Sequence, residues 1–274
     1  MTTDHFSKPF LKWPGGKYRL AEKICASLGP GKRLIEPFVG SGAVFLNSHY
    51  PKYLLADSNP HLIRLYRILQ QEGEVFIDYC EELFTPDNNE ESVYYDMRAQ
   101  FNETGDERLQ SALFVYLNRH CYNGLCRYNS KGRFNTPFGR YKRPYFPRRE
   151  LTAFHRRSAS ATFAPAHYAE TLDRVRKGDV VYCDPPYIPL SRTANFTDYF
   201  AGGFGEQDQV DLADHAARLA RRGIQVVISN HNTAFICDLY MDAGAAMRRF
   251  QVQRSISCQG GNRTKVGEIL AVFG

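Results

Sequence analysis

The stretch RLIEPFVGSGAVFLN, residues 33–47, contains a short apolar strand, a glycine-rich turn and the start of a helix. Gly40 and Gly42 stand on either side of Ser41 and let the backbone come close to a ligand, because glycine carries no side chain. The complete dinucleotide-binding fingerprint is absent, since Phe45 stands where its third glycine is required. A nucleoside-containing ligand without a pyrophosphate fits this turn better, although a tight turn that binds nothing has the same pattern.

The next segment, residues 52–71, repeats the order of strand, polar turn and helix. Residues 54–56 form the apolar strand and Asp57 ends it, about twenty residues after the glycine-rich segment begins. At this spacing an acidic side chain accepts hydrogen bonds from the ribose of a bound nucleoside. Ser58 or Asn59 suits the cap of the following helix, and Pro60 suits its first position. The two segments together predict a site for a nucleoside cofactor such as S-adenosylmethionine.

Helical and strand patterns alternate along the rest of the chain. Apolar residues at four-residue spacing predict a helix over residues 17–28. Further helices are expected over most of 72–118 and over 207–222, and strands over 180–183, 224–230 and 266–273. Alternation of this kind predicts a parallel sheet with helices on both faces. Ligands bind beyond the carboxyl ends of such strands, where the glycine-rich turn, Asp57, Asp184 and residues 229–231 are all expected.

The composition is that of a globular protein of 274 residues, of which 43% are hydrophobic and 23% charged. No apolar run reaches the length that crosses a bilayer, and the first ten residues lack the pattern of a signal peptide, so we expect a cytoplasmic protein. The seven cysteines are odd in number and include no C-x-x-C pair, which argues against a disulfide framework or a structural zinc site. We expect a monomer that holds no metal.

Positive charge is concentrated in one part of the chain. The formal net charge is +6, but residues 119–157 contain eleven lysines and arginines and a single acid, which gives this segment +10 and the remainder −4. Aromatic residues are interleaved with these charges, among them Tyr122, Tyr128, Phe134, Phe138, Tyr141, Tyr145 and Phe146. Basic side chains bind phosphates, and aromatic rings stack on bases or wedge between them. The segment predicts a nucleic-acid interface; the alternative is a solvated loop whose rings belong to the core.

Residues 180–187, VVYCDPPY, bring an acid, two prolines and a tyrosine to the end of a strand. An exocyclic aromatic amine is a weak nucleophile, because its lone pair is shared with the ring. The Asp184 carboxylate and the Pro185 carbonyl can accept its two N–H groups, and the Tyr187 ring can stack on the base. A base can enter such a socket only after it has left the duplex. We therefore predict direct methyl transfer to nitrogen, driven by positioning and by the two acceptors, although an Asp-Pro pair also begins ordinary turns.

Four motifs resemble those of the Dam-like adenine-N6 DNA methyltransferases, in which the cofactor motif comes first, a target-recognition insert follows and an Asp-Pro-Pro-Tyr box comes last. They are FLKWPGGK at 10–17, IEPFVGSGAVFLN at 35–47, YLLADSN at 53–59 and DPPY at 184–187. The likeness extends through 116–147, 193–199, 228–231 and 255–271 and so covers nearly the whole chain. It implies an α/β fold with a Rossmann-like methyltransferase sheet, mostly parallel with helices on both faces, and a mainly helical target-recognition insert.

The resemblance also implies a division of the chain and an activity. Residues 1–58 and 145–274 would form the catalytic domain that binds S-adenosylmethionine, and residues 59–144 the DNA-binding insert. The activity would be methyl transfer from S-adenosylmethionine to the N6 amine of adenine in double-stranded DNA, within GATC, after the base has flipped into the DPPY pocket.

Site residues are carried over from the family position by position. The expected catalytic residues are Asp184, Pro185 and Tyr187. The residues expected to bind the cofactor are Trp13, Lys17, Phe38, Gly40, Gly42, Asp57 and Asp184. The residues expected to contact DNA are Lys12, Tyr122, Asn123, Leu125, Arg127, Pro137, Arg140 and Tyr141. Of these, the residues at 122, 123 and 125 match a loop that inserts into the duplex.

Three other functions are compatible with parts of the sequence. The N4 amine of cytosine could occupy the same DPPY socket. A DNA-binding regulator could keep the fold without turnover, but it need not retain Asp184, Tyr187 and Asp57. An RNA-modifying enzyme would suit the basic segment but not the full-length likeness. We expect residues 229–231, SNH, to support the pocket wall and assign His231 no acid–base role.

Overall fold

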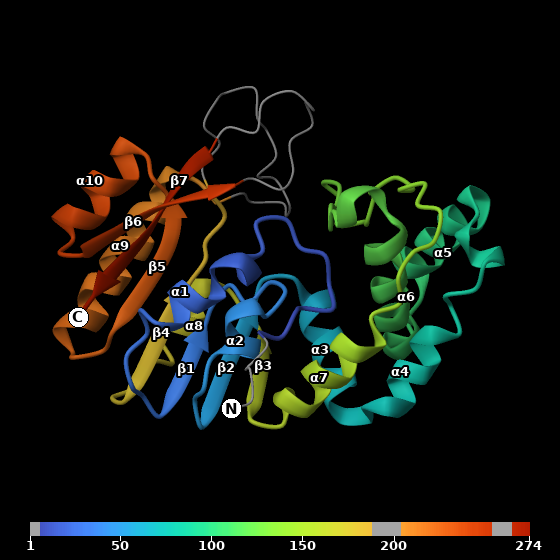
Figure 1. The fold of residues 1–274 in the computed structure, drawn as a ribbon, viewed down its shortest axis with the longest axis horizontal. Helices are drawn as coiled ribbons and strands as arrows, with labels where there is room; N and C mark the ends of the chain where they lie inside the picture. Colours follow the sequence, from blue (N-terminus) through green and yellow to red (C-terminus); the bar gives the residue numbers. More distant parts are fainter. Residues whose placement is uncertain (1–5, 188–203, 254–264) are drawn as a thin grey trace.

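A seven-stranded sheet forms the centre of the computed structural model, which describes residues 6–187, 204–253 and 265–274 (Figure 1). Its strands lie in the order β3-β2-β1-β4-β5-β7-β6. Their bounds are β1 Arg33–Glu36, β2 Lys52–Asp57, β3 Ala161–Pro165, β4 Asp179–Cys183, β5 Val226–His231, β6 Ala246–Gln253 and β7 Lys265–Phe273. The first five strands are parallel, whereas β7 runs antiparallel to both β5 and β6. The motif at 193–199 and the part of the last motif at 255–264 lie outside the described residues.

Alternate residues of the central strands pack into two separate hydrophobic clusters, one on each face of the sheet. Leu34 and Leu55 belong to one cluster, and their neighbours Ile35 and Leu54 belong to the other. Helices α1 Ala21–Cys25, α2 Ala43–Asn47, α3 Pro60–Glu72 and α7 Arg148–Ser158 supply the first cluster, and α8 Tyr168–Leu172, α9 Glu206–Arg221 and α10 Ala234–Asp242 supply the second. The expected mostly parallel sheet with helices on both faces is therefore confirmed.

Three helices form a lobe beyond the β3 edge of the sheet (Figure 1): α4 Glu74–Glu81, α5 Glu91–Glu103 and α6 Glu107–His120. Helix α3 links this lobe to the sheet, because it packs against β3 on one side and α6 on the other. The chain then runs from 121 to 147 without a long regular element, apart from the short 3₁₀ turn η3 Tyr122–Gly124. The mainly helical insert is confirmed, while its boundaries at 59 and 144 stay a prediction.

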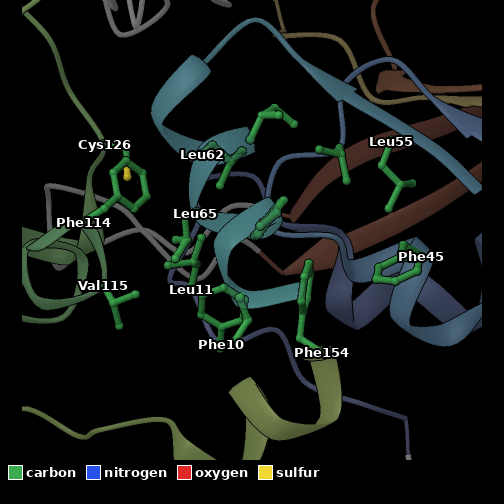
Figure 2. Packing of buried hydrophobic residues seen from close by; sticks show 14 of the residues in the cluster. Phe10, Leu11, Phe45, Leu55, Leu62, Leu65, Phe114, Val115, Cys126 and Phe154 are labelled. Atoms are coloured by element: carbon green, nitrogen blue, oxygen red, sulfur yellow. The ribbon is translucent and has the colours of Figure 1, made fainter. Parts of the chain in front are cut away.

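One hydrophobic cluster joins the lobe and the sheet. Phe154 of α7 lies at its centre and meets four rings at centroid distances of 4.5–6.0 Å. These rings are Phe10 before the first helix, Phe45 of α2, Tyr66 of α3 and Phe163 of β3. Figure 2 shows Phe10, Phe45 and Phe154 turned toward one another. Because the same cluster includes residues of α5 and α6, the lobe and the sheet share one interior.

Several local expectations need correction. The helix expected over 17–28 is a 3₁₀ turn, η1 Lys17–Leu20, followed by the short α1. Asn59 rather than Ser58 caps α3, since its side chain accepts hydrogen bonds from the backbone of His61 and Leu62. The strands β3 and β6 and the helices α7, α8 and α10 were not expected. β3 and β6 are the edges of the sheet, where a strand needs fewer apolar side chains.

The aromatic rings of the basic segment are mostly structural. Tyr128 and Phe134 are 6% and 2% exposed, and Phe138 and Phe146 pack against the same hydrophobic cluster. Tyr122 is 45% exposed. The expectation that interleaved rings stack on bases is therefore wrong for Tyr128 and Phe134, because their rings are buried in the core; Phe138 and Phe146 are half-buried against it.

Several arginines of the basic segment are also structural. Arg157 donates to the carbonyl of Ser48 and to the hydroxyl of Tyr53. Arg148 forms ion pairs with three acids of α4, namely Glu74, Asp78 and Glu81. The charge of the segment therefore overstates the number of cations that can face a ligand.

Candidate functional site

A cavity of about 600 Å³ lies at the carboxyl ends of β1, β2 and β4. Its lining includes eight of the nine residues expected to bind the cofactor or take part in catalysis: Trp13, Lys17, Phe38, Gly40, Asp57, Asp184, Pro185 and Tyr187. A cavity of this volume suits a small organic ligand. The ninth, Gly42, is not part of the lining. It has φ +72° and lies behind the turn, where a Cβ would sit 3.3 Å from the Phe154 ring.

The glycine-rich turn is held against the end of β2 by Asp57. One carboxylate oxygen accepts from the backbone N–H of Gly40 at 3.0 Å, and the other accepts from Asn59 at 2.9 Å. Gly40 has φ +47°, and a Cβ there would lie 2.8 Å from Nε1 of Trp13. Glycine is therefore needed both for the backbone conformation and for the close approach of Trp13. Burial raises the pKa of Asp57 to about 6.

Asp184 receives two donors on the same oxygen. Lys17 Nζ lies 2.9 Å from Oδ1, and the Ser229 hydroxyl donates to Oδ1 at 2.8 Å. The hydroxyls of Ser229 and Tyr182 are themselves hydrogen-bonded at 3.0 Å. Lys17 also donates to the carbonyl of Gly15 at 2.9 Å. This arrangement holds a carboxylate, 21% exposed, in a fixed orientation at the cavity wall.

The DPPY box is supported from behind by β5 and α9. The ring of Tyr187 meets the ring of His231 at a centroid distance of 4.2 Å. The carbonyl of Pro186 accepts from Gln209 at 3.3 Å, and Gln209 in turn accepts from Asn230 at 3.0 Å. Together with the bond from Ser229 to Asp184, these contacts agree with the expectation that residues 229–231 support the pocket wall.

Glu36, the last residue of β1, was not expected in the site. It lines the cavity and is 2% exposed, and its Oε1 has no hydrogen-bond partner among the described residues. Burial, and then the nearby charge of Asp184, raise the pKa of Glu36 well above its usual range. An unpaired oxygen in a buried carboxyl group is costly, and a cationic ligand group would compensate it. The signal in the sequence was an acid at the end of an apolar strand.

Two aromatic residues of the cavity, Tyr168 of α8 and Phe204 just before α9, were also not expected. Phe38 stacks on Tyr168 with a centroid distance of 5.4 Å and meets Phe204 edge-on at 5.7 Å. All three rings line the cavity, together with His167. They make one part of the cavity wall apolar and flat, which suits a planar heterocycle. These residues lie far apart in the sequence, so only the fold brings them together.

Five of the eight residues expected to contact DNA touch one another. The backbone N–H of Tyr122 donates to the carbonyl of Pro137 at 2.8 Å, and that of Asn123 donates to the hydroxyl of Tyr141 at 3.0 Å. Lys12 Nζ lies 4.0 Å from the centroid of the Tyr141 ring. Residues from three separate segments therefore form one surface beside the cavity.

The remaining three lie around this surface. Arg140 is 77% exposed and pairs with Glu91 of α5 at 3.0 Å. Arg127 is exposed and donates to the side chain of Asn135 at 2.8 Å. Leu125, partly exposed, follows the η3 turn. Exposed contacts of this kind are weak, so both guanidinium groups can exchange them for another partner.

The described residues include neither a metal-binding cluster nor a membrane-spanning helix. Within 6–187, 204–253 and 265–274, no group of three or more His, Cys, Asp and Glu side chains could hold a metal ion. No helix of the same part of the chain is long and apolar enough to cross a membrane.

Comparison with known proteins identifies the family. The family model for the D12 class N6 adenine-specific DNA methyltransferases matches residues 13–256. The DNA adenine methylases of Vibrio cholerae and Escherichia coli K12 are 50% and 47% identical over 267 residues, which cover 97% of this chain and 96% and 95% of theirs. The DNA adenine methylase of Serratia marcescens is 47% identical over 268 residues, 97% of this chain and 98% of its own. The chain therefore belongs to the D12 class of N6 adenine-specific DNA methyltransferases.

Proposed function

We propose that this DNA adenine methyltransferase uses S-adenosylmethionine and acts on an adenine that has left the duplex, within the sequence GATC. The observation that carries the proposal is the single cavity shared by the glycine-rich turn, Asp57 and the DPPY box. Such a cavity can hold a nucleoside cofactor and a nucleobase next to each other.

The residues of the cavity fit the chemical groups of S-adenosylmethionine. We infer that Asp57 accepts from the ribose, that the rings around Phe38 hold the adenine, and that Glu36 compensates the ammonium group of the amino-acid part. When bound, the cofactor supplies an electrophilic methyl group on a positively charged sulfur. The unpaired Oε1 of the buried Glu36 carboxyl group favours this assignment, because a cation beside it would compensate this oxygen.

The target amine would be held by Asp184 and Pro185. Lys17 and Ser229 occupy Oδ1 of Asp184, so we infer that Oδ2 accepts one N–H of the adenine and the Pro185 carbonyl accepts the other. Tyr187 would stack on the base. The contact between Lys17 Nζ and Oδ1 of Asp184, at 2.9 Å, fixes the carboxylate so that its other oxygen can face the base. These contacts favour a pyramidal nitrogen whose lone pair is less shared with the ring and can attack the methyl group from the face of the base, and the proton of the product can pass to water.

The base can reach this socket only by leaving the stack. We infer that the exposed ring of Tyr122 and the side chain of Leu125 enter the duplex at the target, since apolar groups inserted between base steps unstack them. Arg127 and Arg140 then contact base edges in the major groove, because a guanidinium group can donate two hydrogen bonds to guanine.

The direct test is expression in a host that lacks DNA methylation. We expect its DNA to resist a nuclease that cuts only unmethylated GATC, and nucleoside mass spectrometry to detect N6-methyladenine. N4-methylcytosine as the only product would instead assign the DPPY socket to cytosine. Methylation of structured RNA in preference to duplex DNA would overturn the proposed substrate.

Cofactor affinity should depend on pH through Asp57. Burial raises the pKa of Asp57 to about 6, so the carboxyl group is protonated below this pH and loses part of its capacity to accept from the ribose. We expect the affinity for S-adenosylhomocysteine to be constant between about pH 6.5 and about pH 7.5. Below about pH 6 it should fall by up to about tenfold for each pH unit. Isothermal titration calorimetry measures it. Asp57→Asn should bind more weakly without this inflection; an unchanged inflection would assign the titration to Glu36.

Arg140 should control sequence discrimination. Arg140→Ala should reduce discrimination at one base pair of the target by about 1–3 kcal/mol, because a bidentate contact to guanine is lost. Arg133→Ala is the matched control, since Arg133 also pairs with an acid of α5, Glu103, at 3.0 Å. Arg133→Ala should weaken binding to all sequences alike. It should also reduce the slope of log binding constant against log salt concentration by about one. Rates on GATC and on single-substitution duplexes decide between them; uniform loss in both variants would make Arg140 a phosphate contact.

A further inference from the structure

Asn118 of α6 holds the backbone of Lys12 from both sides. Its Oδ1 accepts from the N–H of Lys12 at 2.8 Å, and its Nδ2 donates to the carbonyl of Lys12, also at 2.8 Å. The side chain is 1% exposed. A buried amide that forms such a reciprocal pair acts as one rung of a sheet and fixes the position of the segment that it holds.

The same amide contacts two other parts of the protein. Nδ2 lies 3.3 Å from the carbonyl of Gly124 in the η3 turn, and 3.7 Å from Sγ of Cys126, which lines the cavity. Lys12 directly precedes Trp13, which lines the cavity and meets Gly40. Asn118 is therefore in contact with the cofactor side, with the loop that carries Tyr122, and with the cavity wall.

The η3 turn leaves no space between itself and this N-terminal segment. A Cβ added at Gly124 would lie 2.3 Å from Cβ of Lys12 and 2.8 Å from its Cδ. The backbone of the segment is also held at Phe10, whose carbonyl accepts from the guanidinium group of Arg119. A displacement of the η3 turn would therefore displace Lys12, because packed atoms at this distance cannot move independently.

We propose that Asn118 is a positioning residue that couples DNA recognition by the loop at 122–125 to cofactor binding at the 12–17 segment. When DNA moves the loop, Asn118 and the close contact between Gly124 and Lys12 transmit the movement to Trp13 and Lys17. Cofactor affinity then depends on whether the target duplex is bound. The inference rests on the proposed function, since it needs a cofactor and a DNA substrate.

The chain supplies matched controls for both parts of this junction. Asn102 of α5 forms the same kind of reciprocal pair with the backbone of Phe134, at 2.7 and 3.0 Å. Gly132 has φ +70°, close to the +66° of Gly124, but a Cβ there would have no atom within 4 Å. Alanine at either glycine imposes the same backbone strain, and only at Gly124 does it also press on Lys12.

The experiment measures the coupling ratio, which is the dissociation constant of S-adenosylhomocysteine without DNA divided by that with a GATC duplex. For the wild type we expect a ratio on the order of tenfold. Asn118→Ala and Gly124→Ala should reduce it to about one, whereas Asn102→Ala and Gly132→Ala should keep it. By reciprocity, the cofactor product should change DNA affinity by the same factor in each variant. If these residues had only a structural role, the melting temperature would fall in all four variants. The coupling ratio would then not differ between Asn118→Ala and Asn102→Ala, or between Gly124→Ala and Gly132→Ala.

The outcomes are distinct. A wild-type ratio of one, or an equal ratio in each variant and its control, overturns the coupling. If Asn118→Ala does not fold, Gly124→Ala against Gly132→Ala decides alone. Methyl transfer to the duplex by the wild type is measured in parallel: its absence would refute the proposed function, whereas transfer with a ratio of one refutes only the role of Asn118.

Discussion

Replacing Asp184 with asparagine should slow methyl transfer about a thousandfold, which corresponds to about 4 kcal/mol in the activation barrier. Asparagine keeps an oxygen that can accept from Lys17 and Ser229, but it replaces Oδ2 with a donor. The inferred acceptor for the adenine amine is then lost, and an N–H group faces another N–H group. Single-turnover rates with saturating cofactor and DNA measure the effect, and cofactor affinity should change much less than the rate.

Ser229→Ala is the control for this variant. It removes a donor to the other oxygen of Asp184 and leaves the proposed amine acceptor in place. We expect a loss of about tenfold or less, since one hydrogen bond from an uncharged donor is removed while Lys17 still contacts the same oxygen. Near-normal turnover in Asp184→Asn would contradict the role of Asp184. An equal loss of rate in both variants would mean that only the orientation of the Asp184 side chain matters, and not an acceptor at Oδ2.

Phe154→Ala should destabilise the protein by about 3–5 kcal/mol, because a buried ring is removed from between four others and the cavity cannot collapse completely. Its neighbours come from the N-terminal segment, α2, α3 and β3, so several elements lose packing at once. The free energy of unfolding from urea titration measures the loss. The variant should also show weaker cofactor binding, since the Phe154 ring packs directly behind the glycine-rich turn. A Cβ added at Gly42 would lie 3.3 Å from this ring.

Phe235→Ala provides the comparison, since Phe235 on α10 is 43% exposed. Its truncation should change the free energy of unfolding by about 0.5 kcal/mol or less. A loss at Phe154 no larger than that at Phe235 would contradict the view that one cluster holds the sheet and the lobe together.

The central strands and the long helices could be predicted from the sequence because they bury continuous apolar faces. Two strands could not: β3 has five residues, of which two are buried, and β6 contains the adjacent Arg248 and Arg249. Both lie at the edges of the sheet, where periodicity is weak. Helix α7 could not be predicted because it is highly charged. Leu151 and Phe154 are its large apolar side chains, and two such residues give only a weak periodic pattern.

The site was predictable to the extent that its residues lie within local motifs. Asp57 ends β2, Asp184 directly follows β4 and Gly40 lies in the turn after β1, and parallel topology brings such ends together. Glu36 also ends a strand, but the sequence does not show that its carboxyl group is buried, and the rings of Tyr168 and Phe204 belong to no such motif. Their role depends on which atoms lack partners or face one cavity, and only coordinates contain that information.

The shared interior between the lobe and the sheet limits how target preference can be altered. Exchange of α4 to α6 with a relative would create mismatched apolar surfaces against α3 and α7, because these helices contribute to the same cluster. A chimaera would therefore need to exchange α3 and α7 together with the lobe. Changes to individual exposed side chains between 121 and 147 avoid this incompatibility, which makes them the more practical route to an engineered variant.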